Sequence, residues 1–276
     1  MRPAPRPTED ADNGDMLRQY RELGWCRFPF DPRLANWLEE SRSAIDATLT
    51  NPENAEWWRY QDTWFAGVNV LPNDVNGVVG GGPRLAGTAV DFVLETLGFR
   101  GIAWDRAQVS VCRAGYPLPM SGESDSLYRF RRDRDAAHVD GLLKEGSERR
   151  RFLKEFHAFI LGIPATYYDE GAAPLTVWEG SHKLVGDWFR KTLGTVPHNG
   201  WGKIDLTDGY QAVRKQAFET CRRIRISAAP GEAYIVHRHA VHGMAKWEDG
   251  AKADPKGRIV VYFRPPTDDP DQWMAP

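Results

Sequence analysis

The stretch that decides the fold is EAYIVHRHAVHGMAKW, which runs from Glu232 to Trp247. It begins as a short apolar run with β-branched and aromatic residues, which is typical of a buried strand. Similar runs recur from Ala107 onwards, separated by loops that contain glycine or proline. These runs are AQVSVCR (107–113), EFHAFILGI (155–163), PLTVW (174–178), RRIRISA (222–228) and RIVVYFR (258–264). A series of short strands with this punctuation predicts a mainly β fold, either a sandwich or a barrel.

Helical patterns precede the strands. They predict helices over residues 16–23, 31–48 and 84–97. Gly24 is a typical stop for the first helix, and Asp31 followed by proline is a typical start for the second. The predicted fold is therefore a β core with flanking helices.

The first residues differ in composition from the rest. Residues 1–14 combine three prolines with acidic and small polar residues, which predicts a disordered tail. We expect one domain over residues 15–276, with a helical N-terminal part and a β core at about 107–264.

The bulk properties exclude several classes of protein. A formal net charge of −2 over 276 residues provides no general attraction to nucleic acid or to an anionic membrane. No run reaches the ~18 apolar residues of a membrane helix, and the first residues do not resemble a signal peptide. The 3 cysteines form no CxxC pair and therefore indicate neither a disulfide framework nor a cysteine-rich zinc site. We expect a cytoplasmic protein that binds neither nucleic acid nor membrane.

Two long segments, 116–135 and 183–221, interrupt the series of strands. Long excursions in a compact domain are often lids or binding loops. In the first of them, arginines alternate with aspartates, which is typical of a solvated loop; the alternative role is to hold an anionic substrate. The arginines concerned are Arg129, Arg131, Arg132 and Arg134.

Candidate metal ligands occur in two segments. His138 and Asp140 are two residues apart in AAHVDGLL, so on an extended backbone both side chains leave the same face. This pair alone is a weak signal, because a chain with 7 histidines and 38 acidic residues contains such a pair by chance. The decisive stretch offers His237, His239 and His242 as a third ligand. Two histidines and one carboxylate form a set that leaves positions on iron open for other ligands.

The last predicted strand is flanked by two arginines, Arg258 and Arg264. A guanidinium can bind a carboxylate through two parallel hydrogen bonds, which a lysine cannot. The two arginines share strand parity but lie roughly 20 Å apart at ~3.3 Å per residue. Only one of them can therefore bind the same small carboxylate compound.

Taken in order, these segments resemble the phytanoyl-CoA dioxygenase-like family of iron(II)- and 2-oxoglutarate-dependent oxygenases. The matching features are HVD, APLTVWEGSHK, PGEAYIVHRHAVHG and GRIVVYF, within about residues 107–264. The resemblance implies a double-stranded β-helix, which is a jelly-roll, cupin-like barrel with the metal at its open mouth.

The resemblance also implies roles for individual residues. His138 and Asp140 match the family's proximal metal pair, and His242, which is followed by Gly243, matches the distal histidine. Arg258 matches the arginine that binds the distal carboxylate of 2-oxoglutarate.

Other residues near these motifs are weaker candidates. We expect Arg264 to lie at a rim or in a structural ion pair, and His182 to form a structural hydrogen bond. His157, Trp178 and Trp247 are candidates for the wall of the pocket, with a buried structural role as the alternative.

The implied activity is that of a hydroxylase with iron(II) as cofactor and 2-oxoglutarate and O2 as co-substrates. A small-molecule substrate would be hydroxylated while 2-oxoglutarate is decarboxylated to succinate and CO2, and no catalytic residue is expected beyond the metal site. Asp140 favours hydroxylation over halogenation, because related halogenases lack this carboxylate. One alternative is a cupin-like metalloenzyme that does not use 2-oxoglutarate and does not need Arg258. Another is a β-barrel binding module without a catalytic metal.

Overall fold

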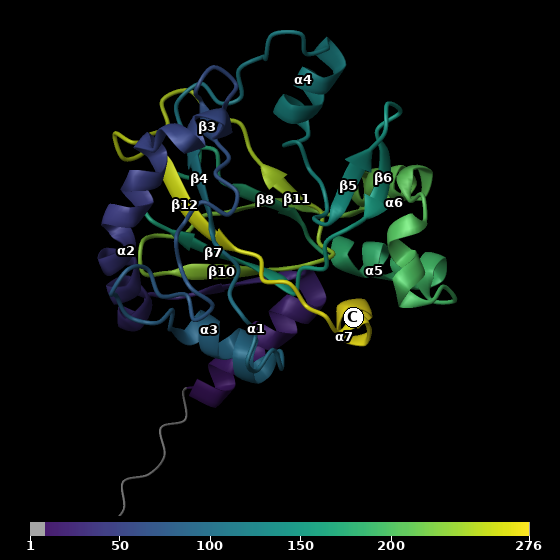
Figure 1. Cartoon of the computed structure of the whole chain (residues 1–276), viewed down its shortest axis with the longest axis horizontal. Coiled ribbons are helices and arrows are strands. Elements are labelled where there is room, and N and C mark those ends of the chain that lie inside the picture. The colour runs from purple at the N-terminus through teal and green to yellow at the C-terminus, as the bar shows by residue number, and fades with distance from the viewer. Residues whose placement is uncertain (1–8, 276) are drawn as a thin grey trace, which may run out of the picture.

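The computed structural model describes residues 9–275, and a large antiparallel sheet forms their centre (Figure 1). The sheet has the strand order β1-β10-β7-β12-β4-β3-β2. Its strands are β1 (Trp25–Phe28), β2 (Trp58–Arg59), β3 (Trp64–Phe65), β4 (Gln108–Cys112), β7 (Phe159–Pro164), β10 (Ala233–His237) and β12 (Arg258–Phe263). A smaller sheet has the order β11-β8-β9, with β8 (Leu175–Trp178), β9 (Arg223–Ile226) and β11 (His242–Met244). A separate hairpin consists of β5 (Leu142–Glu145) and β6 (Arg150–Leu153).

The two larger sheets face each other, and the chain crosses repeatedly between them. After β7 in the large sheet, β8 and β9 lie in the small sheet, β10 in the large, β11 in the small and β12 in the large. Side chains from both sheets meet in one buried cluster, with Ile160, Tyr234 and Val260 from the large sheet and Leu175 and Val177 from the small sheet. The space between the sheets is therefore the interior toward which every second residue of these strands points.

Helices cover the outer faces of the sheets (Figure 1). On the large sheet, Trp37 of α2 packs with its ring centroid 5.7 Å from that of Phe263 on β12. Beyond the small sheet, Phe189 of α5 and Tyr210 of α6 share a buried cluster with Trp178 of β8. The α-helices are α1 (Glu9–Leu23), α2 (Pro32–Thr50), α3 (Thr88–Asp91), α4 (Asp125–Asp133), α5 (Ser181–Leu193), α6 (Thr207–Thr220) and α7 (Pro270–Met274). The chain also forms the 3-10 helices η1 (Pro52–Trp57) and η3 (His198–Lys203) and the π-helix η2 (Phe92–Thr96). No helix within residues 9–275 is long and apolar enough to cross a membrane.

Most predicted elements are confirmed. The strand runs correspond to β4, β7, β8, β9, β10 and β12, and the second helix begins where Asp31 predicts. The Asp31 side chain accepts hydrogen bonds from the backbone N–H of Arg33 and from that of Thr88, both at 2.8 Å. One carboxylate thus caps α2 and fixes α3 beside it.

Several expectations need correction. The helical share is larger than a mainly β fold implies: the structure is a mixed α/β fold with a large antiparallel sheet, and the expected flanking helices cover both outer faces. The predicted tail includes residues 9–14, which belong to α1; residues 1–8 lie outside the described residues. The helix expected over 84–97 begins only at Thr88, after Gly87 with φ of 150°.

The long segment 116–135 contains helix α4 instead of a solvated loop. Ser124 caps this helix by accepting a hydrogen bond from the N–H of Leu127 at 3.3 Å. Arg131 is buried and bonded to Glu123, with 2.6 Å between Nη2 and Oε2. The Arg131 guanidinium is therefore neutralised within the protein and is not free to hold an anionic substrate.

A cluster of buried histidines lies where β10 meets α5. The ring centroid of His237 is 4.9 Å from that of His182 and 5.2 Å from that of His239. Burial lowers the pKa of His182 to about 4. Burial, reinforced by the charge of Arg238, holds the pKa of His237 and that of His239 well below their usual range. All three rings are neutral in the folded protein at neutral pH.

We expect the free energy of unfolding to decrease as the pH falls below about 6.5, the ordinary pKa of histidine. In that range the unfolded chain binds protons at these histidines and the folded chain does not, so stability is complete above pH 6.5 and is lost towards pH 4. The contribution of each histidine is at most ~1.4 kcal/mol per pH unit.

Urea unfolding at about pH 7.5 and about pH 5.5 measures this loss. His239→Phe should reduce the difference between the two midpoints, because phenylalanine suits a site between Phe189 and Trp273 and does not titrate. The matched control is His198→Gln, at an exposed histidine, which should keep the wild-type difference. An unchanged pH dependence in His239→Phe would contradict the explanation.

Candidate metal centre

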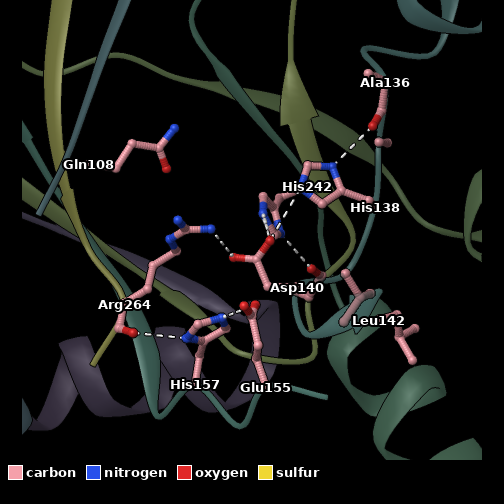
Figure 2. A network of polar contacts seen from close by, with 12 residues as sticks. Gln108, Ala136, His138, Asp140, Leu142, Glu155, His157, His242 and Arg264 are labelled. Carbon is pink, nitrogen blue, oxygen red and sulfur yellow. Dashed lines mark hydrogen bonds and ion pairs between the residues drawn. The ribbon is translucent and has the colours of Figure 1, made fainter. Parts of the chain in front are cut away.

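Three predicted metal ligands, His138, Asp140 and His242, meet in the structure (Figure 2). One ligand atom from each side chain lies within 4.8 Å of the others. Asp140 Oδ1 is 3.2 Å from His138 Nε2 and 3.7 Å from His242 Nε2. Among the described residues, no second group of three histidine, cysteine or acidic side chains is as close together.

Backbone pairing brings the two halves of this group together. The N–H of His138 donates to the carbonyl of His242 at 2.8 Å, and the N–H of His242 donates to the carbonyl of His138 at 3.0 Å. Gly243 permits the close approach, because a Cβ at this position would lie only 2.3 Å from the carbonyl oxygen of Asp135. The segment with the His-x-Asp pair is thereby fixed to the edge of β11.

Both imidazoles are oriented by main-chain carbonyls. Nδ1 of His138 donates to the carbonyl of Ala136 at 3.0 Å, and Nδ1 of His242 donates to that of Ala240 at 2.9 Å. A carbonyl only accepts hydrogen bonds, so the proton of each neutral ring lies on Nδ1 and Nε2 keeps its lone pair. Both free lone pairs lie beside Asp140, as ligation of one ion requires.

The charges around Asp140 keep it ionised. Burial acts to raise the pKa of Asp140, but Arg264, His242 and His138 together hold that pKa well below its usual range. Arg264 Nη1 lies 3.4 Å from Asp140 Oδ2, whereas the histidines lie beside Oδ1. Burial lowers the pKa of His242 to about 4, so this ring is neutral at physiological pH. An ionised carboxylate and a neutral imidazole are the ligating forms of these groups.

A cavity of about 430 Å³ gives access to the three ligands. His138 is the most accessible, with a side chain that is 46% exposed, whereas those of Asp140 and His242 are each 8% exposed. Two imidazoles and one carboxylate that open on one side into a cavity suit non-haem iron(II) with free positions for exogenous ligands.

The alternative distal ligands, His237 and His239, lie in the buried histidine cluster and not at this site. The N–H of His239 donates to Nδ1 of His237 at 3.1 Å. His182 accompanies them, and its Nε2 donates to the carbonyl of Arg21 at 3.1 Å, in line with the expected structural role.

Arg258, the first residue of β12, and Arg264, which follows its last residue, differ in their surroundings. Arg264 lines the cavity and forms the expected ion pair, with Asp140 as its partner. Arg258 is completely buried in the interior, and its Nη2 donates to the hydroxyl of Tyr262 at 3.2 Å. Tyr262 itself lines the cavity, so one side chain separates the Arg258 guanidinium from it.

The three candidates for the pocket wall do not line the cavity, which corrects that prediction. His157 lies behind Arg264, where it bonds to the Arg264 carbonyl at 2.8 Å and to Glu155 at 3.2 Å (Figure 2). Trp178 has the opposite strand parity to Leu175, which does line the cavity, and therefore points to the outer face of the small sheet. Trp247 donates to the carbonyl of Ala251 in the loop beyond β11.

Sequence reasoning missed an aromatic part of the wall. Residues 57–65, WWRYQDTWF, contain the last residue of η1 and the strands β2 and β3 at the edge of the large sheet. Trp57, Tyr60 and Trp64 from this segment line the cavity. The density of aromatic residues was the available signal. Nothing in the order of residues indicated that this segment pairs with β4 beside the metal ligands.

Comparisons with known proteins give only distant similarities. No protein-family model and no curated protein matches the chain. Among solved structures, the non-haem α-ketoglutarate-dependent carbocyclase SnoK from nogalamycin biosynthesis is 16% identical, with 91% of this chain and 83% of that chain covered and a TM-score of 0.47. The non-haem α-ketoglutarate-dependent epimerase SnoN of the same biosynthesis is 12% identical, with 93% of this chain and 84% of that chain covered and a TM-score of 0.44. EctD from S. alaskensis with bound Fe is 11% identical, with 96% of this chain and 79% of that chain covered and a TM-score of 0.44.

These TM-scores, all below 0.5, are too low to support an argument about function. The resemblance to the phytanoyl-CoA dioxygenase-like family therefore stays a prediction. Function has to be argued from the residues of this chain.

We expect the protein to bind one equivalent of a divalent transition metal. Cobalt(II) titration, followed by its visible absorption, should show saturation at one ion per chain. His242→Ala and Asp140→Ala should each weaken binding by at least about 100-fold, because each removes a ligand and not only an outer contact. His157→Ala is the matched control, since His157 lies nearby but outside the ligand group. Full binding in His242→Ala would exclude this metal centre.

Proposed function

We propose that this protein is an iron(II)- and 2-oxoglutarate-dependent oxygenase that hydroxylates a small-molecule substrate. The observation that carries the proposal is the presence of the His138, Asp140 and His242 group together with a buried guanidinium, Arg258, that has no anionic partner among residues 9–275. A metal ligand set with open positions and a separate buried cation together suit a compound that chelates the metal at one end and has a carboxylate at the other.

The surroundings of Arg258 differ from those of the buried Arg131 and Arg238 and of the half-buried Arg264. Arg131 pairs with Glu123, and Arg264 pairs with Asp140. Arg238 donates to the carbonyls of Gln272, Trp273 and Ala275 at 2.6 to 2.7 Å. For Arg258, Nε and Nη1 find no hydrogen-bond partner within residues 9–275.

A buried cation without a partner is costly, so its persistence supports the binding of an anion there. Tyrosines surround this guanidinium and extend toward the cavity. Tyr234 donates to the hydroxyl oxygen of Tyr262 at 3.0 Å, and that same oxygen accepts from Arg258. The proton of Tyr262 is thus left to donate to a further acceptor. Gly162 makes this arrangement possible, because a Cβ there would lie 2.2 Å from the ring of Tyr234. A carboxylate bound here would be recognised by both Arg258 and Tyr262.

Arg264 is the competing candidate for the carboxylate, since it lines the cavity and lies nearer to the ligand group. Its charge is already paired with that of Asp140. A 2-oxoglutarate bound to Arg264 would have to compete with a metal ligand for the same guanidinium. We therefore assign the distal carboxylate to Arg258 and the orientation of Asp140 to Arg264.

The strand order supports a double-stranded β-helix. β4, β12, β7 and β10 are neighbours in the large sheet, whereas the segment at His138, β11, β8 and β9 are neighbours in the small one. Eight segments divided between two facing sheets with repeated crossings are typical of a jelly roll.

The roles of the protein groups follow from their positions. His138, Asp140 and His242 would hold iron(II), which when bound supplies the oxidation chemistry with O2 and 2-oxoglutarate. Arg258 and Tyr262 would orient 2-oxoglutarate, and the cavity wall would exclude water from the reacting centre. Overall, one oxygen atom of O2 enters the substrate C–H bond and the other enters succinate, with release of CO2.

Anaerobic addition of iron(II) and then 2-oxoglutarate tests the assignment. We expect a weak visible charge-transfer band when the keto acid chelates a metal with open positions. Arg258→Met keeps a similar length and apolar stem but loses the charge, so it should still bind one metal ion while its affinity for 2-oxoglutarate falls about 100-fold.

Arg264→Met is the comparison variant, and it should retain the band. Loss of 2-oxoglutarate binding in Arg264→Met together with its retention in Arg258→Met would reverse the two roles. Metal binding without any band in the wild type would contradict the use of 2-oxoglutarate. That result would favour a cupin-like metalloenzyme with the same three ligands.

A further inference from the structure

Four aromatic side chains form one wall of the cavity: Trp57, Tyr60, Trp64 and Tyr116, here called the aromatic wall. The rings of Tyr60 and Trp64 are stacked, with centroids 5.6 Å apart and planes at 8°. Tyr116 lies 6.0 Å from Tyr60 and 6.3 Å from Trp64, at steep angles to both. Such a wall offers a flat apolar surface to a ligand.

The aromatic wall is fixed by contacts with neighbouring side chains. The guanidinium of Arg131, fixed by Glu123, lies 3.7 Å from the ring centroid of Tyr60. Trp64 donates its indole N–H to Ser110 at 3.2 Å. The wall is therefore ordered before a ligand binds, which reduces the entropy lost on binding.

Arg59 lies beside this wall and is exposed at the cavity. Its guanidinium carbon is 5.4 Å from the ring centroid of Trp57 and 5.9 Å from that of Trp64. Over the range 9–275 no acidic side chain forms an ion pair with it. An unpaired guanidinium held over aromatic rings is ready to bind an anion.

The other charged groups of the cavity are already paired. Asp135 accepts two hydrogen bonds from Arg223, at 2.6 and 3.0 Å. Asp140 and Arg264 form an ion pair with each other. Arg59 therefore remains as the charged cavity residue without an ionic partner among residues 9–275, and its charge is available to a ligand.

We propose that the substrate is a planar, apolar molecule with an anionic group, whose body packs on the aromatic wall and whose anion binds Arg59. The oxidation of this substrate at the neighbouring metal centre rests on the proposed function, whereas the binding of the substrate to the aromatic wall and Arg59 does not. The opposite end of the substrate would extend toward His138, the most accessible of the three ligands.

A pair of isosteric probes tests the proposal on the full chain by isothermal titration calorimetry. The probes are 2-naphthoate, which is planar and anionic, and 2-naphthamide, which is planar and neutral. We expect 2-naphthoate to bind about tenfold more tightly, as one charge-assisted contact at a solvent-accessible arginine provides. The titrations are made on the protein as purified and again under argon with saturating iron(II) and 2-oxoglutarate.

Variants separate the two parts of the proposed site. Arg59→Met keeps an apolar side chain over the rings but removes the charge, so it should abolish the preference for 2-naphthoate and leave the affinity for 2-naphthamide unchanged. Trp64→Leu should weaken both probes to a similar extent. The matched control is Arg21→Met, at an exposed arginine of α1 outside the cavity wall, which should behave as the wild type does.

The outcomes distinguish this proposal from the proposed function. Equal binding of the two probes to the wild type, or an undiminished preference in Arg59→Met, would overturn the role of Arg59, even if the charge-transfer band with 2-oxoglutarate appears. Absence of that band together with an Arg59-dependent preference for 2-naphthoate would instead support the anion site at Arg59 and contradict the proposed oxygenase function.

Discussion

Two backbone hydrogen bonds between His138 and His242 are the contacts on which the rest of the site depends. They join a loop that carries the carboxylate to the edge strand of the small sheet. Because main-chain atoms make the connection, the positions of the ligands are set by folding and not by the metal. The carbonyls of Ala136 and Ala240 then fix the rotation of the two rings. A metal ion bound by these three side chains would meet ligands that folding has already oriented, which favours tight binding and a defined geometry.

Strand β12 organises the polar interior along a single line. Its side chains alternate, so that Arg258, Val260, Tyr262 and Arg264 share the inner face while Ile259, Val261 and Phe263 pack against the helices. The inner residues run from a buried cation through a hydroxyl to a guanidinium beside the metal ligands. One strand thus places both guanidinium groups on the inner face, and the spacing between their backbone positions is fixed by the rise of the strand.

The sequence predicted well which three side chains lie together as a possible metal site and predicted poorly which residues line the cavity, for a physical reason. His138, Asp140 and the strands around them are local patterns, and burial of an apolar strand leaves few alternatives for where it lies. The wall of the cavity depends on non-local contacts, such as the pairing of Trp64 with Cys112 and the stacking of Arg131 on Tyr60. The same lack of long-range information made Arg131 look solvated like its exposed neighbours in α4, whereas it is 3% exposed. Trp178 was misplaced because strand parity alone does not tell which face of a sheet points to the cavity.

Gly162 illustrates how far the influence of the site extends into residues without functional groups. It lies on the strand between β10 and β12, opposite both Tyr234 and Tyr262, and its missing side chain leaves room for their hydroxyls to meet. Even the smallest side chain would push the ring of Tyr234 away and break the chain of hydroxyls that ends at Arg258. In a saturation mutagenesis map, position 162 would therefore be as intolerant as the metal ligands, although it has no chemistry of its own. Intolerance to mutation in this protein marks the space that reactive groups need as well as the groups themselves.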